Sequence, residues 1–256
     1  LRDWRFTYLV IGLSVMVLGI SAAMFLRRTP EDMGLLPDGD AAKLEGITKM
    51  PALTGYTLAE SLRTPVFWIV CAMWALVAMP IFLVIVHTVP YATSMKIGSV
   101  AAAGILTVMG AANISGRLIF GSIVDRIGSR LALLIALVIQ TAALLLFVYA
   151  RDLRIFYLAG LLFGVSYGGV DVIILGVVAD FFGRRYLGII IGVASIAWRI
   201  GAAMGPILGG LVSDVTGSYS LAFLAVAIGI AACTGLVFIL FAQKPGLYTS
   251  PPAPRG

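Results

Sequence analysis

The sequence predicts an all-α fold, a polytopic membrane bundle of seven transmembrane helices. Of its 256 residues, 61% are apolar and only 12% are charged, against about 25% charged in an ordinary soluble domain. The mean hydropathy is +1.05. Crossing the hydrocarbon core takes about 20 apolar residues. Seven runs reach that length, at residues 6–26, 66–88, 97–119, 131–150, 155–179, 187–212 and 219–242. Their helical length, without period-two alternation, excludes a transmembrane barrel.

The first run, residues 6–26, is too long for the core of a signal peptide, and no small-residue cleavage site leads from it into a soluble domain. The chain begins with Leu1 rather than methionine. We therefore expect the chain to be the downstream part of a longer protein.

A single long connection, residues 27–64, separates the first run from the other six. Within it, Thr57 and Glu60 form a T-x-x-E pattern, which predicts a capping box at the start of a short interfacial helix that ends before Pro65. The alternative is a polar loop in which the pattern is accidental. Six spans after such a linker equal one half of a 6+6 transporter, so residues 1–26 would be the last helix of a preceding half.

The distribution of basic residues predicts the orientation of the chain. If the linker faces the cytoplasm, twelve lysines and arginines lie on the cytoplasmic side and five outside, as the positive-inside rule requires. The cytoplasmic set is Arg27, Arg28, Lys43, Lys49, Arg63, Arg117, Arg126, Arg130, Arg184, Arg185, Lys244 and Arg255. This bias predicts a plasma-membrane protein with residues 27–64 and the tail, residues 244–256, in the cytoplasm. The net charge of +6 is thus a topology signal, and no nucleic-acid partner is expected.

The sequence favours no enzyme class and no cofactor. It contains no phosphate-binding loop, no cluster of metal ligands and no dinucleotide fingerprint. The stretch GVSYG, residues 164–168, matches G-x-S-x-G, but that pattern needs a strand-to-helix turn and here it falls within a helix. Cys71 and Cys233 both lie in apolar runs, so we expect no disulfide.

A charged turn joins the runs 97–119 and 131–150. It fits G-x-x-x-D-R-x-G-x-R and consists of Gly121, Asp125, Arg126, Gly128 and Arg130. The glycines permit a tight turn between closely packed helices. The aspartate is placed to face the N-terminus of a neighbouring helix, and the arginines suit an anionic membrane surface.

This turn resembles the signature loop of the major facilitator superfamily, which recurs between the second and third helices of each half. Three further stretches, at residues 27–39, 57–68 and 179–185, are similar to the monocarboxylate and oxalate/formate branch. The resemblance covers nearly the whole chain. It implies a last helix of the N-terminal half at 1–26, a central linker at 27–64, a six-helix C-terminal half at 65–243 and a tail at 244–256. It also implies that the charged turn is a cytoplasmic gating loop.

A second pattern, G-x8-G-x3-G-P-x2-G-G, is formed by Gly192, Gly201, Gly205, Pro206, Gly209 and Gly210. It resembles the antiporter motif of the superfamily, which belongs to helix five, whereas here it falls on the counterpart, helix eleven. We therefore expect close helix packing and a kink at the proline rather than antiport as such. The spacing of Gly160, Gly164 and Gly168 also predicts helix packing.

Arg199 lies in the middle of the run 187–212, where a charge costs at least about 2.5 to 3.5 kcal/mol unless it faces a cavity or a partner. Asp171 lies about 6 Å from that level by helical rise, so we expect the two to pair. Either Arg199 binds an anionic substrate group while Asp171 holds it or carries a proton, or the pair only joins two helices. The oxalate/formate branch is similarly known for a cation on helix eleven. Three polar residues are further candidates for lining the site, namely Tyr167, Asn113 and Gln140.

Together these features predict a secondary active transporter of a small organic anion, monocarboxylate-like, working by alternating access with proton coupling or exchange. Its expected partners are that substrate, a coupling proton, the lipid bilayer and a missing N-terminal half. The alternatives are a transporter of neutral or cationic drugs and a stand-alone seven-helix receptor or scaffold. His87, the single histidine, is expected at the outer interface.

The orientation gives a labelling prediction. A cysteine at Ser129 should react with a membrane-impermeant maleimide only from the cytoplasmic side, because this residue lies in the charged turn. A cysteine at Ser218 should react only from outside. Labelling in the reverse pattern would contradict the whole topology.

Overall fold

The computed structural model describes residues 4–25 and 55–242. Most of the expected linker, residues 27–54, and the expected tail, residues 244–256, lie outside these described residues. The chain divides into two compact units, Leu1–Ala52 and Leu53–Gly256.

The described residues of the first unit, 4–25, form one helix, α1, Trp4–Phe25. Its 22 residues extend about 33 Å at about 1.5 Å each, enough to cross a hydrocarbon core of about 30 Å. Ser14 and Ser21 each donate a hydrogen bond to a carbonyl one turn earlier, at 2.8 Å. Both hydroxyls are therefore satisfied inside the helix, as a membrane-spanning helix requires.

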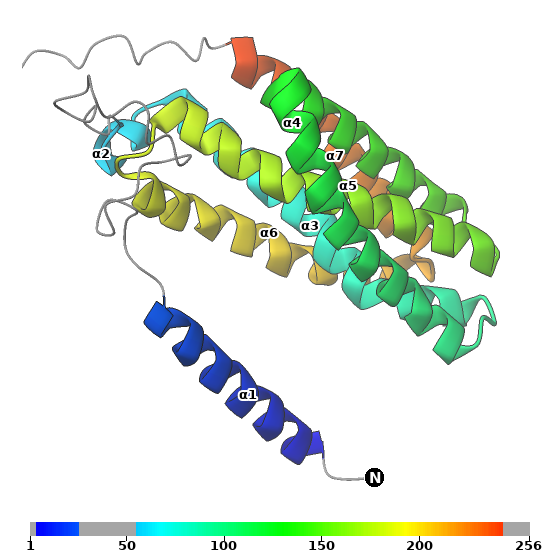
Figure 1. Ribbon diagram of the computed structural model, residues 1–256. Coiled ribbons are helices and arrows are strands. Elements are labelled where there is room, and N and C mark those ends of the chain that lie inside the picture. The colour runs from blue at the N-terminus through cyan, green and yellow to red at the C-terminus, as the bar shows by residue number, and fades with distance from the viewer. Residues whose placement is uncertain (1–3, 26–54, 243–256) are drawn as a thin grey trace, which may run out of the picture. The chain divides into compact units, whose positions relative to one another are not determined.

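The second unit is a bundle of helices that lie side by side (Figure 1). Its elements are a short helix α2, Leu58–Leu62, followed by α3, Pro65–Ser94, α4, Ser99–Tyr149, α5, Leu153–Phe182, α6, Leu187–Thr216, and α7, Ser220–Ala242. We call the end of the bundle near Gly55, Gly128 and Gly183 the linker end. The end near Tyr91, Arg151 and Ser220 is the far end.

Helix α4 supplies two of the expected spans. Its 51 residues would extend about 76 Å, more than twice the thickness of the hydrocarbon core. The helix breaks at Gly128, where φ is 80° and ψ is 159°, a backbone conformation that suits glycine alone. Figure 1 shows the ribbon reversing direction in the middle of α4. The first arm, residues 99–127, and the second arm, residues 129–149, match the expected runs 97–119 and 131–150.

The prediction of seven spans is therefore confirmed. In the described part of the chain, six helices are long and apolar enough to cross a membrane, and one of them is the two-armed α4. The all-helical fold class is confirmed as well.

The linker end is organised by local caps. Thr57 and Glu60 form the predicted capping box at the start of α2, with bonds of 2.8 and 3.3 Å. The backbone N–H of Thr57 donates to the Glu60 carboxylate and lowers the pKa of that group. Thr64 caps α3, whose first residue is Pro65, the position where a missing N–H costs least. Gly55 pairs with Gly183 in a β-bridge, which attaches the end of the linker to the α5–α6 turn.

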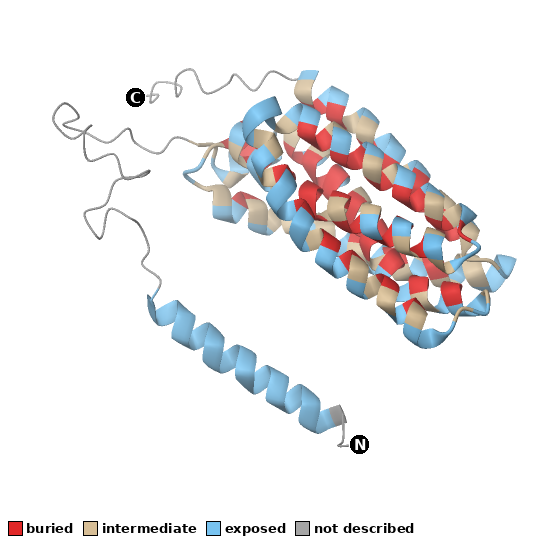
Figure 2. Cartoon of the chain, turned by 45° about the vertical axis from the view of Figure 1, so that its right-hand side comes forward, coloured by how far each residue is buried: buried red, intermediate tan, exposed pale blue. Residues whose placement is uncertain are grey.

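Figure 2 colours each residue of the bundle by its burial, with buried residues along the helices where they face one another and exposed residues on the outer faces. The first arm of α4 packs closely on α5 through glycines. A Cβ placed on Gly164 or Gly168 would clash with the backbone carbonyls of Met109 and Asn113. Gly116 approaches the backbone of Val165 in the same way. Small residues thus allow the two backbones to touch, which is how helices associate in lipid.

A second glycine interface joins α6 to α3. A Cβ on Gly201 would clash with the Ala75 carbonyl, and one on Gly205 with the Met79 carbonyl. Gly209 lies against the ring of His87. In contrast, Gly192 and Gly210 have open space where a Cβ would stand, so these two glycines of the pattern lie off this interface. Pro206 lies inside α6.

The α4–α5 interface gives a stability prediction. Gly164→Ala should destabilise the purified protein by about 1–3 kcal/mol, because the added methyl group overpacks a backbone contact. Gly176→Ala on the same helix is the matched control, since no atom lies within 4 Å of its Cβ position. Thermal unfolding in detergent measures both variants. Equal unfolding temperatures for the two would contradict the close contact.

Candidate functional site

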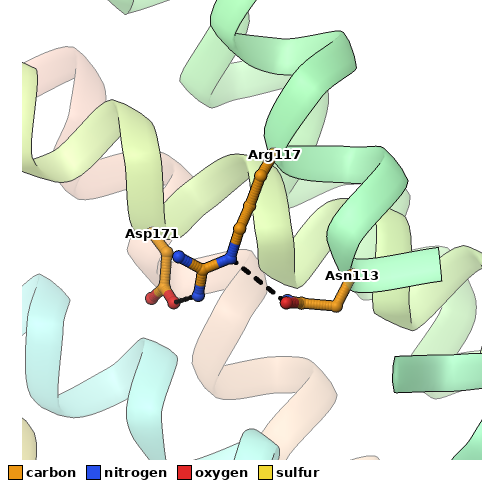
Figure 3. Close-up of polar contacts among 3 residues, drawn as sticks. All are labelled: Asn113, Arg117 and Asp171. Carbon is orange, nitrogen blue, oxygen red and sulfur yellow. Dashed lines mark hydrogen bonds and ion pairs between the residues drawn. The ribbon is translucent and has the colours of Figure 1, made fainter. Parts of the chain in front are cut away.

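An ion pair joins the first arm of α4 to α5. Nη2 of Arg117 lies 2.8 Å from Oδ2 of Asp171. Nε of the same arginine donates to Oδ1 of Asn113, one turn earlier, at 3.2 Å. Figure 3 shows the guanidinium held between the carboxylate and the amide. The planar fork of arginine is thus fixed by two acceptors on different helices.

The glycine interface places this pair. Gly168 lies against the Asn113 carbonyl and the Arg117 backbone nitrogen, so one of the close approaches between the two helix backbones lies beside the charged side chains. Any larger residue at that position would separate α4 from α5 and lengthen the 2.8 Å contact between Arg117 and Asp171.

Three charged residues share one depth in the bundle. Arg117 precedes Gly128 by about eleven residues, and Asp171 precedes Phe182, the end of α5, by the same number. At 1.5 Å per residue both lie about 16 Å from the linker end. Arg199 follows Leu187, the start of α6, by about twelve residues and lies about 18 Å from that end. All three are well inside the hydrocarbon core.

These charged side chains are not enclosed by the bundle. Arg117 is 48% exposed and Asp171 22%, and Arg199 is also exposed. Ionised groups at this depth face a protein surface or a water-filled cavity rather than lipid, because the hydrocarbon cannot solvate them. The face that carries Arg117 and the face that carries Arg199 are therefore not lipid-facing.

The expected pairing of Arg199 with Asp171 is wrong. Asp171 binds Arg117 instead, while Nη1 of Arg199 donates to the hydroxyl and the carbonyl of Ser195, at 2.6 and 3.2 Å. Both bonds stay within α6. The reason lies in the packing, because α5 packs closely on the first arm of α4, whereas α6 packs chiefly on α3. Arg199 and Asp171 lie at nearly the same depth, but they stand on helices that do not pack closely on each other.

The other candidate residues separate into two environments. Tyr167 is half-buried on α5, one turn before Asp171, so it lies on the same face as the ion pair. Gln140 is fully buried in the second arm of α4, and its amide has no hydrogen-bond partner among the described residues. The structure therefore groups Tyr167 with Asn113, Arg117 and Asp171, and keeps Gln140 in the packed interior.

The charged turn lies at the linker end. Ser129 donates a hydrogen bond to Asp180 of α5 at 3.2 Å. The Arg130 guanidinium lies 5.6 Å from the centre of the Phe238 ring of α7, a cation–π distance. Asp125 and Arg126 are exposed, and within the described residues neither forms an ion pair. Ser129 and Arg130 thus attach the turn to α5 and α7, whereas the side chains of Asp125 and Arg126 lie on the surface.

Sequence reasoning missed Arg117 as a site residue. It assigned this arginine to the cytoplasmic side as a topology charge, although it falls within the run 97–119. Two signals could have identified it. Asn113 precedes it by four residues, which places the amide on the same helix face, and Asp171 lies equally far from the end of its own helix.

Comparisons with known proteins agree with this architecture. The family model of the Major Facilitator Superfamily matches residues 1–152 and again residues 99–256. The chain is similar to an uncharacterized MFS-type transporter, YhjX, of Escherichia coli (strain K12), with 31% identity over 57% of the chain and 37% of the relative. It is also similar to monocarboxylate transporter 12-B of Danio rerio, with 25% identity over 69% of the chain and 38% of the relative. The chain therefore spans less than two fifths of these relatives.

Two solved structures share the fold. One is a POT family transporter in complex with 5-aminolevulinic acid, with a TM-score of 0.56 and 20% identity over 71% of this chain and 37% of that one. The other is the MFS transporter FucP in the outward conformation, with a TM-score of 0.59 and 18% identity over 89% of this chain and 64% of that one. At these low sequence identities, the two structures indicate a shared fold and no shared function.

The ion pair gives a double-mutant prediction. Arg117→Ala or Asp171→Ala alone should destabilise the protein by about 1–3 kcal/mol, because each leaves a charge without its partner inside the membrane. Removing both should recover most of the loss, as thermal unfolding will show. The control is the pair Arg199→Ala and Asp171→Ala, which are not in contact and should add without recovery. Recovery in the control pair, and not in the first, would contradict the observed pairing.

Proposed function

Because this chain belongs to the major facilitator superfamily, we propose that it is the C-terminal six-helix half, with the preceding helix and linker, of a secondary active transporter of small organic anions. The complete transporter would contain a second half that covers the exposed charged residues. Alternating access would then occur between the two halves, with the substrate near the bilayer midplane.

The observation that carries this proposal is the presence of two exposed arginines at one depth inside the membrane. Arg117 and Arg199 stand on α4 and α6, about 16 and 18 Å from the linker end. Asp171 neutralises only one of them, so the site keeps a net positive charge. In the proposed complete transporter both arginines face one cavity that the second half covers, and a site of that charge favours a small anion such as a carboxylate, which two guanidinium forks bind well.

The two arginines have different roles in this proposal. Within the part of the chain that the structure describes, Arg199 is held by Ser195 of its own helix alone, and it is the primary ligand of the substrate carboxylate. Arg117 is already bound to Asp171, so an anion that approaches it competes with an internal carboxylate. That competition offers a route to coupling, since protonation of Asp171 would release Arg117 to the substrate and link transport to a proton. Exchange of one anion for another is the alternative form of coupling.

Tyr167 and Asn113 complete the proposed site. Tyr167 lies one turn from Asp171, and Asn113 already contacts Arg117. Their hydroxyl and amide groups provide neutral hydrogen bonds that orient a substrate without adding charge. Gln140, being fully buried, belongs to the interior of the half-bundle, and reaches a substrate only if the second arm of α4 moves.

The proposed orientation places the linker end in the cytoplasm. Among the described residues of the second unit, Arg63, Arg126, Arg130, Arg184 and Arg185 lie at this end, against Lys96, Arg151 and Arg154 at the far end. This excess remains after Arg117 is removed from the count, and it supports the positive-inside assignment. The charged turn would then be a cytoplasmic gating loop, with Asp125 and Arg126 directed toward the second half.

A transporter of neutral or cationic solutes is the second candidate. The observation that favours it is the partly exposed carboxylate of Asp171, which could bind a cation if Arg117 moved away. In that case Arg199 would have a structural role only, through its hydrogen bonds to Ser195 of the same helix.

Uptake measurements test the proposal. In proteoliposomes of the complete gene product, labelled monocarboxylates should enter faster than neutral or cationic drugs. Arg199→Ala should abolish this uptake, and Arg199→Lys should raise KM about tenfold or more, because it keeps the charge and loses the fork. Arg154→Ala at the exposed far end is the control and should behave as wild type. Drug transport that persists in Arg199→Ala would favour the second candidate.

A further inference from the structure

Helix α6 is attached to the bundle by a narrow strip. Only five of its residues are buried, Ile190, Ala194, Gly201, Gly205 and Gly209. Three of them are glycines that touch α3. Partly buried apolar side chains border this strip, among them Trp198, whose ring lies 5.4 Å from the Phe82 ring of α3. After Gly205, only Leu208 and Val212 of α6 pack against the core in this way. The last part of α6 thus has less apolar contact to lose when it moves, so single polar contacts weigh more in fixing its position.

Pro206 divides α6 into two segments. Its ring removes one backbone N–H, which leaves the carbonyl of Ala202 without a helical donor and weakens the helix at that point. The inner segment, residues 187–205, carries Arg199. The outer segment, residues 206–216, leads to the far end. Pro206 and Gly210 follow Arg199 at helical spacing, so both segments border the face on which the arginine stands.

His87 of α3 contacts α6 at Pro206, where the helix is weakened. Its Nε2 lies 3.0 Å from the carbonyl oxygen of Pro206. Because a carbonyl can only accept, Nε2 carries the proton in this contact. The ring is only 9% exposed and lies on Gly209, where a Cβ would clash with it. The Tyr219 ring, just beyond α6, lies 5.3 Å from it. His87, near the far end of α3, is thus a buried contact between two helices; its expected place at the outer membrane interface stays a prediction.

We propose that His87 is a positioning residue that holds the outer segment of α6 on α3, and that its release lets this segment swing at Pro206 and open the approach to Arg199 from the far end. The consequence for transport rests on the proposed function, whereas the contact and the swing do not. The outer segment meets His87 of α3 at Gly209 and through the His87–Pro206 bond, and its other packed side chains are the partly buried Leu208 and Val212. Loss of the hydrogen bond and the ring therefore shifts the bend of α6.

Distances between spin labels test the swing without any substrate. One pair, on Thr93 of α3 and Val215 of α6, reports the outer segment, and a second pair, on Ala72 and Ile196, reports the inner segment. All four residues are exposed. In the complete protein, His87→Leu should raise the population of long outer distances about 2- to 12-fold, the range that one net hydrogen bond gives. The inner distances should not change.

Matched variants separate the hydrogen bond from general disturbance. His87→Gln keeps an N–H donor near the position of Nε2 and should retain the wild-type outer distances. Gly209→Ala should displace the ring and act like His87→Leu, whereas Gly210→Ala, the next residue, has open space and should not. In a His87→Ala background, Gly209→Ala should add nothing further. Unchanged outer distances in His87→Leu, or equal effects of Gly209→Ala and Gly210→Ala, would overturn the proposal.

Uptake then tests the role in transport. His87→Leu should lower the maximal uptake rate at least twofold with a smaller change in KM, because the substrate ligands remain in place, and His87→Gln should restore the rate. A displaced outer segment with a wild-type rate would overturn the gating role. If wild-type protein shows the expected distances but takes up no organic anion, the proposed function fails and the His87 contact stands.

Discussion

The close approach of helix backbones at glycine is the contact on which the rest of this structure depends. In lipid, apolar side chains gain little by leaving one hydrocarbon environment for another, so helices associate through packing and polar contacts. Here α5 touches the first arm of α4 at Gly164 and Gly168, and α6 touches α3 at Gly201 and Gly205. The 2.8 Å ion pair of Arg117 and Asp171 and the His87 contact both lie beside these approaches.

The charged residues follow a second constraint, since no ionised group at that depth can face lipid. Arg117 meets this constraint with two acceptors inside the chain, Asp171 and Asn113. Arg199 meets it only in part, through Ser195 of its own helix. This asymmetry makes Arg199 the residue with most to gain from a ligand, while the Arg117 pair is already stable without one. A single depth in the bundle therefore holds one satisfied cation and one available cation.

The helices could be predicted from the sequence, and their pairing could not. Apolar runs of sufficient length are a local property, and so are the Thr57–Glu60 capping box and the glycine turn at residue 128. The depth of Asp171 and Arg199 also follows from counting along each helix. Which helices lie in contact is a tertiary property. Asp171 faces α4 because α5 packs there. The topology count treated Arg117 as a charge on the cytoplasmic surface, so Arg117 was not considered as the partner of Asp171.

The β-bridge between Gly55 and Gly183 has a consequence for biosynthesis. The two glycines are separated by about 128 residues of chain. At about 5–20 residues per second, the ribosome takes roughly 6 to 26 s to produce the second partner after the first. During that time α3, α4 and α5 must enter the membrane while the start of α3 has no attachment to the α5–α6 turn. The bridge is therefore a late contact, which forms only when the last third of the chain is being made.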